Sequence, residues 1–209
     1  MAQNITPESL ISILAAALAQ KPTKPLVLAL DGRCGSGKTT LADRLARQFP
    51  ASIVLHTDDF YLPPAQRVRG WEKIPCANMD LIRLRDEALR PAYEGQPVLY
   101  RAYSCRAGAY QPAQELAAQP LVILEGSYSH HPLLAGYETL RVFVTCSREE
   151  QTRRLLSALT EQNAFVTRLS DGKTLRFHHM MKTCAGKIFD KLLPERRRLN
   201  QNRYGEWYC

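Results

Sequence analysis

Residues 26–39 read Leu-Val-Leu-Ala-Leu-Asp-Gly-Arg-Cys-Gly-Ser-Gly-Lys-Thr, and the last eight fit the pattern G-x-x-x-x-G-K-[ST] without a gap. This pattern is typical of a loop that cradles phosphates. Gly32 and Gly37 allow a tight turn whose amides can form a nest for anionic oxygen. Lys38 can reach the β- and γ-phosphates, and the Thr39 hydroxyl can bind Mg²⁺. We therefore predict that this stretch binds a nucleoside triphosphate.

The predicted nucleotide contacts come from consecutive residues of this loop and the start of the next helix: Gly32, Arg33, Cys34, Gly35, Ser36, Gly37, Lys38, Thr39 and Thr40. The flanking sequence has the required pattern. The apolar run 26–30 predicts a strand buried on both faces. Apolar residues then recur at helical spacing from Leu41 to Phe49, before Pro50.

Strands alternate with helices along the rest of the chain. Apolar runs predict further strands at 52–56, 121–125 and 140–145. Helical spacing predicts one helix from Leu81 that ends at Pro91, and the capping box Ser147-x-x-Glu150 opens another. Residues 97–110 are consistent with a small hairpin. The alternation favours an α/β fold with a mostly parallel sheet and helices on both faces.

The bulk composition favours one domain. The 209 residues are 45% apolar and carry a formal net charge of +8. We divide the chain into an N-terminal helix (1–24), a core (25–165) and a basic tail (166–209), which holds most of the positive surplus. No aromatic–basic stacking pattern runs through the tail, which argues against a nucleic-acid partner.

Two further features bear on location. The six cysteines are scattered without a C-x-x-C pair or zinc-like spacing, which is typical of a reducing compartment. The apolar run 10–19 lacks a basic n-region and is too short to span a bilayer. Thr6, Pro7 and Glu8 instead predict the start of an ordinary helix. We expect a cytoplasmic protein with no membrane segment, and the oligomeric state stays open.

Polar side chains follow three predicted strands. The phosphate loop follows the first strand, Asp58 and Asp59 follow the second, and Glu125 ends a later one. Ligands of parallel sheets bind at the carboxyl ends of the strands. Phosphoryl transfer needs a phosphate cradle, a metal and a group that positions or deprotonates the nucleophile, and this edge supplies a candidate for each.

Five segments together resemble the uridine kinase family, and most closely the bacterial uridine kinase-like branch of the P-loop nucleoside kinase and phosphoribulokinase group. They are Asp31 to Thr40, Thr57 to Tyr61, Asn78 to Asp80, Tyr100 to Tyr103 and Leu124 to Tyr128. The resemblance covers about residues 25–156. It implies a three-layer α/β/α P-loop NTPase fold with a small acceptor-side hairpin and lid. It also implies an ATP-dependent kinase that uses Mg²⁺ and phosphorylates a small molecule, with a uridine- or cytidine-type acceptor favoured.

The resemblance also implies residue roles. Asp58 would be the general base, and Lys38 would act on the phosphates. Tyr61 and Tyr103 would line the acceptor pocket, and Asp80 would bind ribose hydroxyls. The metal would be held by Thr39 and Glu125, and the lid would carry Arg153 and Arg154.

Each role has a simpler alternative. Asp58 could merely cap the next segment, or Asp59 could be the base, and Asp80 could be only an N-cap. Tyr61 and Tyr103 could be ordinary core aromatics. Arg153 and Arg154 could lie on a solvated helix face, and Glu125 could have only a structural role.

The chain departs from the family pattern in three places. Ser104 stands where many relatives carry an acid, the lid lacks a further arginine after Arg154, and the segment beyond about Arg168 does not resemble the usual ending. A divergent tail and a displaced reading frame both explain that ending.

Three alternative functions stay open. One is a kinase for another metabolite, such as pantothenate, a sugar phosphate or nicotinamide riboside. Another is a nucleotide-binding regulator with weak ATPase activity, and a third is a nucleic-acid-binding NTPase.

Overall fold

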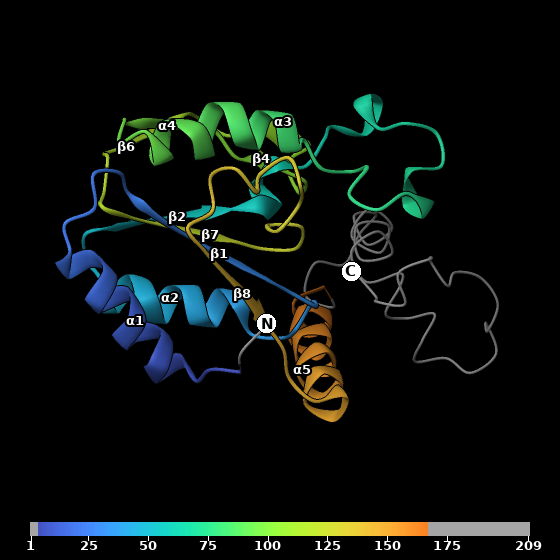
Figure 1. The fold of residues 1–209 in the computed structure, drawn as a ribbon. Helices are drawn as coiled ribbons and strands as arrows, with labels where there is room; N and C mark the ends of the chain where they lie inside the picture. Colours follow the sequence, from blue (N-terminus) through green and yellow to red (C-terminus); the bar gives the residue numbers. More distant parts are fainter. Residues whose placement is uncertain (1–3, 167–209) are drawn as a thin grey trace.

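The computed structural model of the chain describes residues 4–166. The predicted basic tail lies outside the described residues, apart from its first position. At the centre is a sheet with the strand order β2-β7-β1-β8, in which all neighbours are parallel (Figure 1). The strands are β1 (Leu26–Gly32), β2 (Ser52–His56), β7 (Leu121–Glu125) and β8 (Leu140–Val144). All four agree with the sequence prediction to within about one residue.

Helices cover both faces of this sheet, so the predicted three layers are confirmed. One face carries α1 (Pro7–Ala19) and α2 (Lys38–Gln48), and the other carries α3 (Leu81–Arg83), η4 (Leu84–Leu89) and α4 (Arg90–Tyr93) (Figure 1). A further helix, α5 (Arg148–Val166), lies beside the end of the sheet where β1 meets α2.

The core consists of two apolar clusters separated by the sheet. The central strands β1 and β7 are buried along their whole length, as their unbroken apolar sequences predict. Leu28 and Leu30 pack towards α1 and α2, whereas Val27 packs towards the other helical layer. Thr6 caps α1 as predicted, with its hydroxyl accepting from the Ser9 amide at 3.2 Å.

The prediction that Pro91 ends its helix is wrong. The helix passes through Pro91 and continues to Tyr93. Proline lacks an N–H and its ring clashes with the carbonyl four residues earlier in an α-helix. Here the preceding turns are π-helical, and Arg90 donates to the carbonyl of Arg85. This wider turn shifts the bonding by one residue and gives the proline room.

The predicted hairpin is present and is longer than expected. The sequence prediction corresponds to β4 (Tyr103–Ser104) and β5 (Ala109–Tyr110), which pair antiparallel. The same two arms pair again further from the turn, where β3 (Val98–Tyr100) pairs with β6 (Gln114–Leu116). The sequence analysis did not predict β6.

Three short 3-10 helices lie between β2 and α3: η1 (Thr57–Phe60), η2 (Pro64–Gln66) and η3 (Trp71–Lys73). Residues Arg67 and Trp71 of this segment are stacked, with the guanidinium carbon 4.9 Å from the ring centroid. Within residues 4–166 no helix is both long and apolar enough to cross a membrane.

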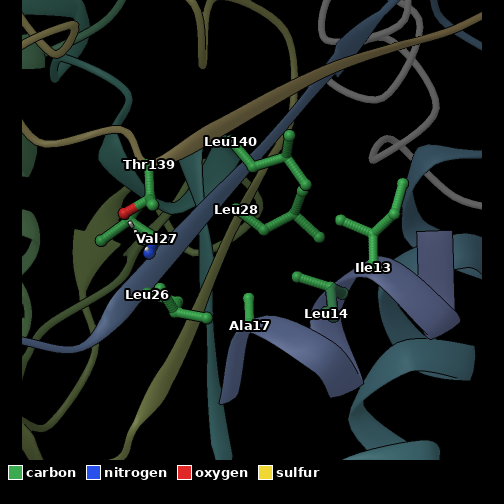
Figure 2. Close-up of a pocket in the computed structure, with 8 residues that line it drawn as sticks. All are labelled: Ile13, Leu14, Ala17, Leu26, Val27, Leu28, Thr139 and Leu140. Carbon is green, nitrogen blue, oxygen red and sulfur yellow. Dashed lines mark hydrogen bonds between the residues drawn. The ribbon is translucent and has the colours of Figure 1, made fainter. Parts of the chain in front are cut away.

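A cavity of about 190 Å³ lies between α1 and the sheet (Figure 2). Its walls are apolar side chains of α1, among them Ile13 and Ala17, facing Leu26 and Leu28 of β1. Its polar side chain is Thr139, whose hydroxyl accepts from the Val27 amide at 3.1 Å. The cavity lies at the amino ends of the strands, away from the phosphate loop, and we regard it as a packing gap.

Candidate functional site

The phosphate loop follows β1 and leads directly into α2, as the motif requires. Gly32 has φ +149°, and a Cβ atom there would lie 2.2 Å from the carbonyl oxygen of Val144. No side chain fits at that distance, so the close approach of β8 fixes a glycine at the start of the loop. The fold alone therefore requires a glycine at this position of the motif.

The Lys38 ammonium lies within the turn of the loop. Its Nζ donates to the carbonyl oxygen of Gly32 at 2.8 Å and to that of Arg33 at 3.2 Å. The side chain is buried, although it carries a charge. Two carbonyl dipoles thus hold the ammonium at the loop, where the motif places the triphosphate.

The two predicted metal ligands lie together. The Thr39 hydroxyl is 3.3 Å from each carboxylate oxygen of Glu125. Glu125 is only 5% exposed, and its Oε1 is 2.6 Å from the Nδ1 atom of His56. This hydrogen bond raises the pKa of His56, while burial works in the opposite direction. Because a carboxylate only accepts, Nδ1 carries the proton.

His56 is not among the site residues predicted from the sequence. It is the register partner of Glu125 in the pairing of β2 with β7, so the two side chains leave the sheet side by side. The one sequence feature that pointed to His56 is its position at the end of a predicted strand, shortly before Asp58 and Asp59. Without the strand order, nothing in the sequence paired it with Glu125.

Asp58 and Asp59 have different surroundings. The Asp58 carboxylate opens to solvent and accepts from the Tyr61 hydroxyl at 3.1 Å. Desolvation by the surrounding protein atoms raises the pKa of Asp58, and the bond from Tyr61 partly offsets this. Asp59 instead accepts from the hydroxyl of Tyr100 at 2.7 Å, and burial together with this bond raises the pKa of Tyr100. Asp59 is thus bonded to a buried tyrosine, whereas the carboxylate of Asp58 is the more exposed of the two.

A cavity of about 490 Å³ opens beside Asp58. It brings together three of the predicted acceptor residues, from η1 and from the hairpin. The lining consists of Asp58, Asp59, Tyr61, Ala102, Tyr103, Ser104, Cys105, Arg106 and Gln111. Tyr103 is 4% exposed and packs edge-on against Tyr110, so it is both a core aromatic and a wall of the cavity.

Asp80, the fourth predicted acceptor residue, does not line this cavity. Its Oδ1 accepts from the Arg83 amide at 3.0 Å, and its Oδ2 lies 3.6 Å from the Arg83 Nε. The side chain therefore caps α3, as the simpler alternative had it. Its role towards ribose hydroxyls stays a prediction.

The two predicted lid arginines occupy different positions on α5. Arg154 Nη1 donates to the carbonyl oxygens of Ser36 at 3.0 Å and Gly35 at 3.3 Å. Arg153 forms a two-point pair with Glu150, at 2.7 and 2.8 Å, on the exposed face of the helix. Glu150 bonds both arginines, and these bonds lower its pKa to about 2. Only Arg154 of the two therefore touches the phosphate loop in the described structure.

The donors at the loop fit Mg²⁺. This ion binds proteins through one or two carboxylates and completes its shell with water and substrate phosphates. Thr39 and Glu125 offer a hydroxyl and a carboxylate beside the phosphate cradle. No cluster of three or more His, Cys, Asp and Glu is present among the described residues, so the site lacks the protein ligands of a closed structural metal centre.

The chain is similar to known proteins in sequence and in fold. No protein-family model matches the chain. The chain is 29% identical to human nicotinamide riboside kinase 2 over 133 residues, which cover 60% of this chain and 54% of that protein. It is 28% identical to the mouse enzyme of the same name over 137 residues, covering 62% of this chain and 66% of that protein. The matched region thus spans between about half and two thirds of these relatives.

Solved structures of other proteins have a similar fold. A possible uridine kinase from Bacillus stearothermophilus aligns with a TM-score of 0.56 at 21% identity, over 69% of this chain and 84% of that one. A protein described as a fructose transport system kinase, from Silicibacter sp. TM1040, aligns with a TM-score of 0.62 at 18% identity, over 77% of this chain and 84% of that one. At this level of identity the likeness concerns the fold. Together with the loop and the parallel sheet, it shows that the chain has a three-layer α/β/α P-loop NTPase fold.

Proposed function

We propose that the protein is an ATP-dependent kinase that transfers the γ-phosphoryl group to a hydroxyl of a small molecule. One observation carries the proposal. Three neighbouring strands, β2, β7 and β1, end at one edge of the sheet, and their ends bring Asp58, Glu125 and the phosphate loop to that edge. A cavity large enough for a metabolite opens beside Asp58. Phosphoryl transfer needs these parts in this arrangement.

The residues suggest the following division of work. The loop amides and Lys38 would hold the triphosphate, and Arg154 would offset charge on the moving phosphoryl group. Asp58 would accept the proton of the acceptor hydroxyl as its oxygen bonds to the γ-phosphorus and the bond to ADP breaks. A carboxylate in this role typically contributes about 10²–10⁴-fold. When bound by Thr39 and Glu125, Mg²⁺ would supply positive charge to the phosphates.

A nucleoside-like acceptor is the finer proposal. The resemblance to uridine kinases supports a uridine- or cytidine-type compound, and the named relatives act on another riboside. Tyr61 and Tyr103 give the cavity two aromatic side chains that suit a ring, and Asp80 would have to turn from its cap to meet ribose hydroxyls. Pantothenate, sugar phosphates and nicotinamide riboside remain the alternative acceptors.

The experiment is an ADP-release assay with Mg·ATP and a panel of hydroxyl compounds, run on the full chain. Asp58→Asn should remove acceptor-dependent ADP release while ATP still raises the melting temperature. The matched control is Asp43→Asn, because Asp43 is an exposed aspartate on α2. Binding of ATP without ADP release for any acceptor would instead identify a nucleotide-binding regulator.

A further inference from the structure

We infer that the acceptor carries an anionic group, a carboxylate or a phosphate, which Arg67 and Arg106 recognise on the hairpin side of the cavity. The inference rests on the proposed kinase function and specifies the class of its acceptor.

The walls of the cavity differ in charge. The η1 wall carries the two carboxylates of Asp58 and Asp59. The opposing wall belongs to the hairpin and includes Arg106. The sequence of residues 101–113, which includes β4, the turn and β5, contains no Asp or Glu. The cavity therefore has an acidic wall and a basic wall.

Arg67, which follows η2, adds a second positive charge beside the hairpin wall, next to Cys105. Its Nε donates to the carbonyl oxygen of Leu62 at 2.8 Å, and its guanidinium stacks on Trp71. The guanidinium also hydrogen-bonds the side chain of Cys105, which lines the cavity. These contacts fix the side chain, so little conformational freedom would be lost when a ligand binds.

The charge of Arg67 is not neutralised by a carboxylate. The side chain is half-buried, yet none of the ion pairs within 4.0 Å that the described part of the chain contains involves it. The surrounding segment, residues 62–71, also lacks acidic residues. A partly desolvated cation without a counter-ion is costly, and a bound anion would relieve that cost. The planar guanidinium matches carboxylate and phosphate oxygens in two-point geometry.

This asymmetry orients the acceptor. An anionic group near Asp58 would meet like charge, so it belongs at the hairpin wall, which leaves the hydroxyl for Asp58. Among nucleoside-like compounds, a riboside with a carboxylated base meets this requirement. Pantothenate and sugar phosphates meet it too. Nicotinamide riboside, whose ring is cationic, does not, and neither do uridine and cytidine, which are neutral. The inference therefore departs from the uridine- or cytidine-type acceptor and keeps only the kinase function proposed above.

The test compares acceptors that differ in the anionic group alone. The pairs are nicotinic acid riboside with nicotinamide riboside, pantothenate with panthenol, and ribulose 5-phosphate with ribulose. For the pair that the enzyme uses, the anionic member should have a kcat/KM higher by about 10- to 100-fold, the range expected for charged hydrogen bonds. The riboside and pantothenate pairs test recognition of a carboxylate, and the ribulose pair tests recognition of a phosphate.

Variants show which residues cause the preference for the anionic member of a pair. Arg67→Gln and Arg106→Gln should each reduce this preference, mainly by raising the KM for the anionic member. The kcat/KM for the neutral member should change little. The control is Arg69→Gln, because Arg69 is exposed in the same loop. Arg106 lies in the exposed turn of the hairpin, so its variant should fold even if Arg67→Gln does not.

Two outcomes separate this inference from the proposed function. The inference is wrong, and the kinase proposal stands, if a neutral member is phosphorylated as well as its anionic partner or if a neutral nucleoside such as uridine is the acceptor that the enzyme uses. An undiminished preference in both arginine variants contradicts the inference in the same way. If no compound in the wider panel supports ADP release, the kinase proposal fails and the inference fails with it.

Discussion

His56 Nδ1 lies 2.6 Å from Glu125 Oε1, and the two residues are register partners on adjacent parallel strands. The same carboxylate lies 3.3 Å from the Thr39 hydroxyl at the start of α2. His56 therefore fixes the orientation of the acid that we expect to bind Mg²⁺. Mutation of a residue that holds a metal ligand in place typically lowers metal affinity by about 10- to 100-fold.

From this contact we predict that His56→Ala raises the Mg²⁺ concentration for half-maximal ADP release by about 10-fold or more. His56→Asn should retain part of the wild-type behaviour, since its amide nitrogen can donate from near the Nδ1 position. The melting temperature with ATP should be measured with and without Mg²⁺ as a second readout. Equal Mg²⁺ dependence in wild type and His56→Ala would contradict a positioning role.

The second prediction concerns pH. Desolvation raises the pKa of Asp58, and the hydrogen bond from Tyr61 lowers it. A general base works in its ionised form, so activity should be lost as pH falls through a pKa above the usual aspartate value of about 4. Tyr61→Phe removes the hydrogen bond that lowers the pKa of Asp58. The fall of kcat/KM at low pH, the acid limb of the profile, should therefore move to higher pH. The measurement is kcat/KM against pH, and a limb that stays in place in Tyr61→Phe would argue against Asp58 as the titrating group.

The same shift has a consequence for stability. A carboxyl group whose pKa is raised by folding destabilises the folded state at pH values where it is ionised. Asp58→Asn should therefore be at least as stable as wild type at pH 7 to 8, although it is inactive. A clear fall in the urea midpoint would show that Asp58 has a structural role instead.

The third prediction separates the two arginines of α5. Arg154 reaches the loop carbonyls, whereas Arg153 pairs with Glu150 on the exposed face. Arg154→Ala should lower kcat by about 10²-fold or more, in line with the loss of one preorganised donor. Arg153→Ala should lower it by less than about 3-fold, since exposed ion pairs contribute little. Steady-state kinetics at saturating ATP provide the comparison, and equal losses would show that α5 moves so that both arginines engage.

Local patterns carried most of the sequence prediction. The strand, loop and helix at 26–48 follow from one continuous motif. The placement of Asp58 and Glu125 at the same edge of the sheet follows from a general property of parallel sheets. The pairing of His56 with Glu125 depends on β2 lying next to β7, and strand order is a tertiary property. The choice between Arg153 and Arg154 likewise depends on the rotation of α5 against the loop, because neighbouring residues point about 100° apart around a helix.

The helix through Pro91 illustrates a different limit. Propensity alone stops a helix before proline. Leu84, Ala88 and Leu89 are completely buried, so tertiary packing holds the segment helical and the backbone widens to π geometry around the proline. Burial overrides the local rule, and no pattern in the sequence gives the amount of burial.

The fourth prediction concerns Gly126, which follows the strand that ends in Glu125. Gly126 has φ +133°, and an added Cβ would lie 2.0 Å from the Oγ1 atom of Thr57. That hydroxyl donates to the carbonyl of Ser127 at 3.0 Å and is completely buried, so it has little room to yield. Gly126→Ala should lower the free energy of unfolding by about 2–4 kcal/mol, because backbone strain and a buried clash combine.

Gly126→Ala should also lower the kinase activity, because the Thr57 side chain that it displaces directly precedes Asp58. Urea denaturation gives the stability change, and Gly136→Ala is the matched control, because an added Cβ there would meet nothing within 4 Å. That control should stay within about 0.5 kcal/mol of wild type. Adding Thr57→Ala to Gly126→Ala removes the clashing oxygen, so the double variant should be more stable than the sum of the single effects predicts. Strict additivity would mean that the two side chains do not meet, and the link between Gly126 and the position of Asp58 would be wrong.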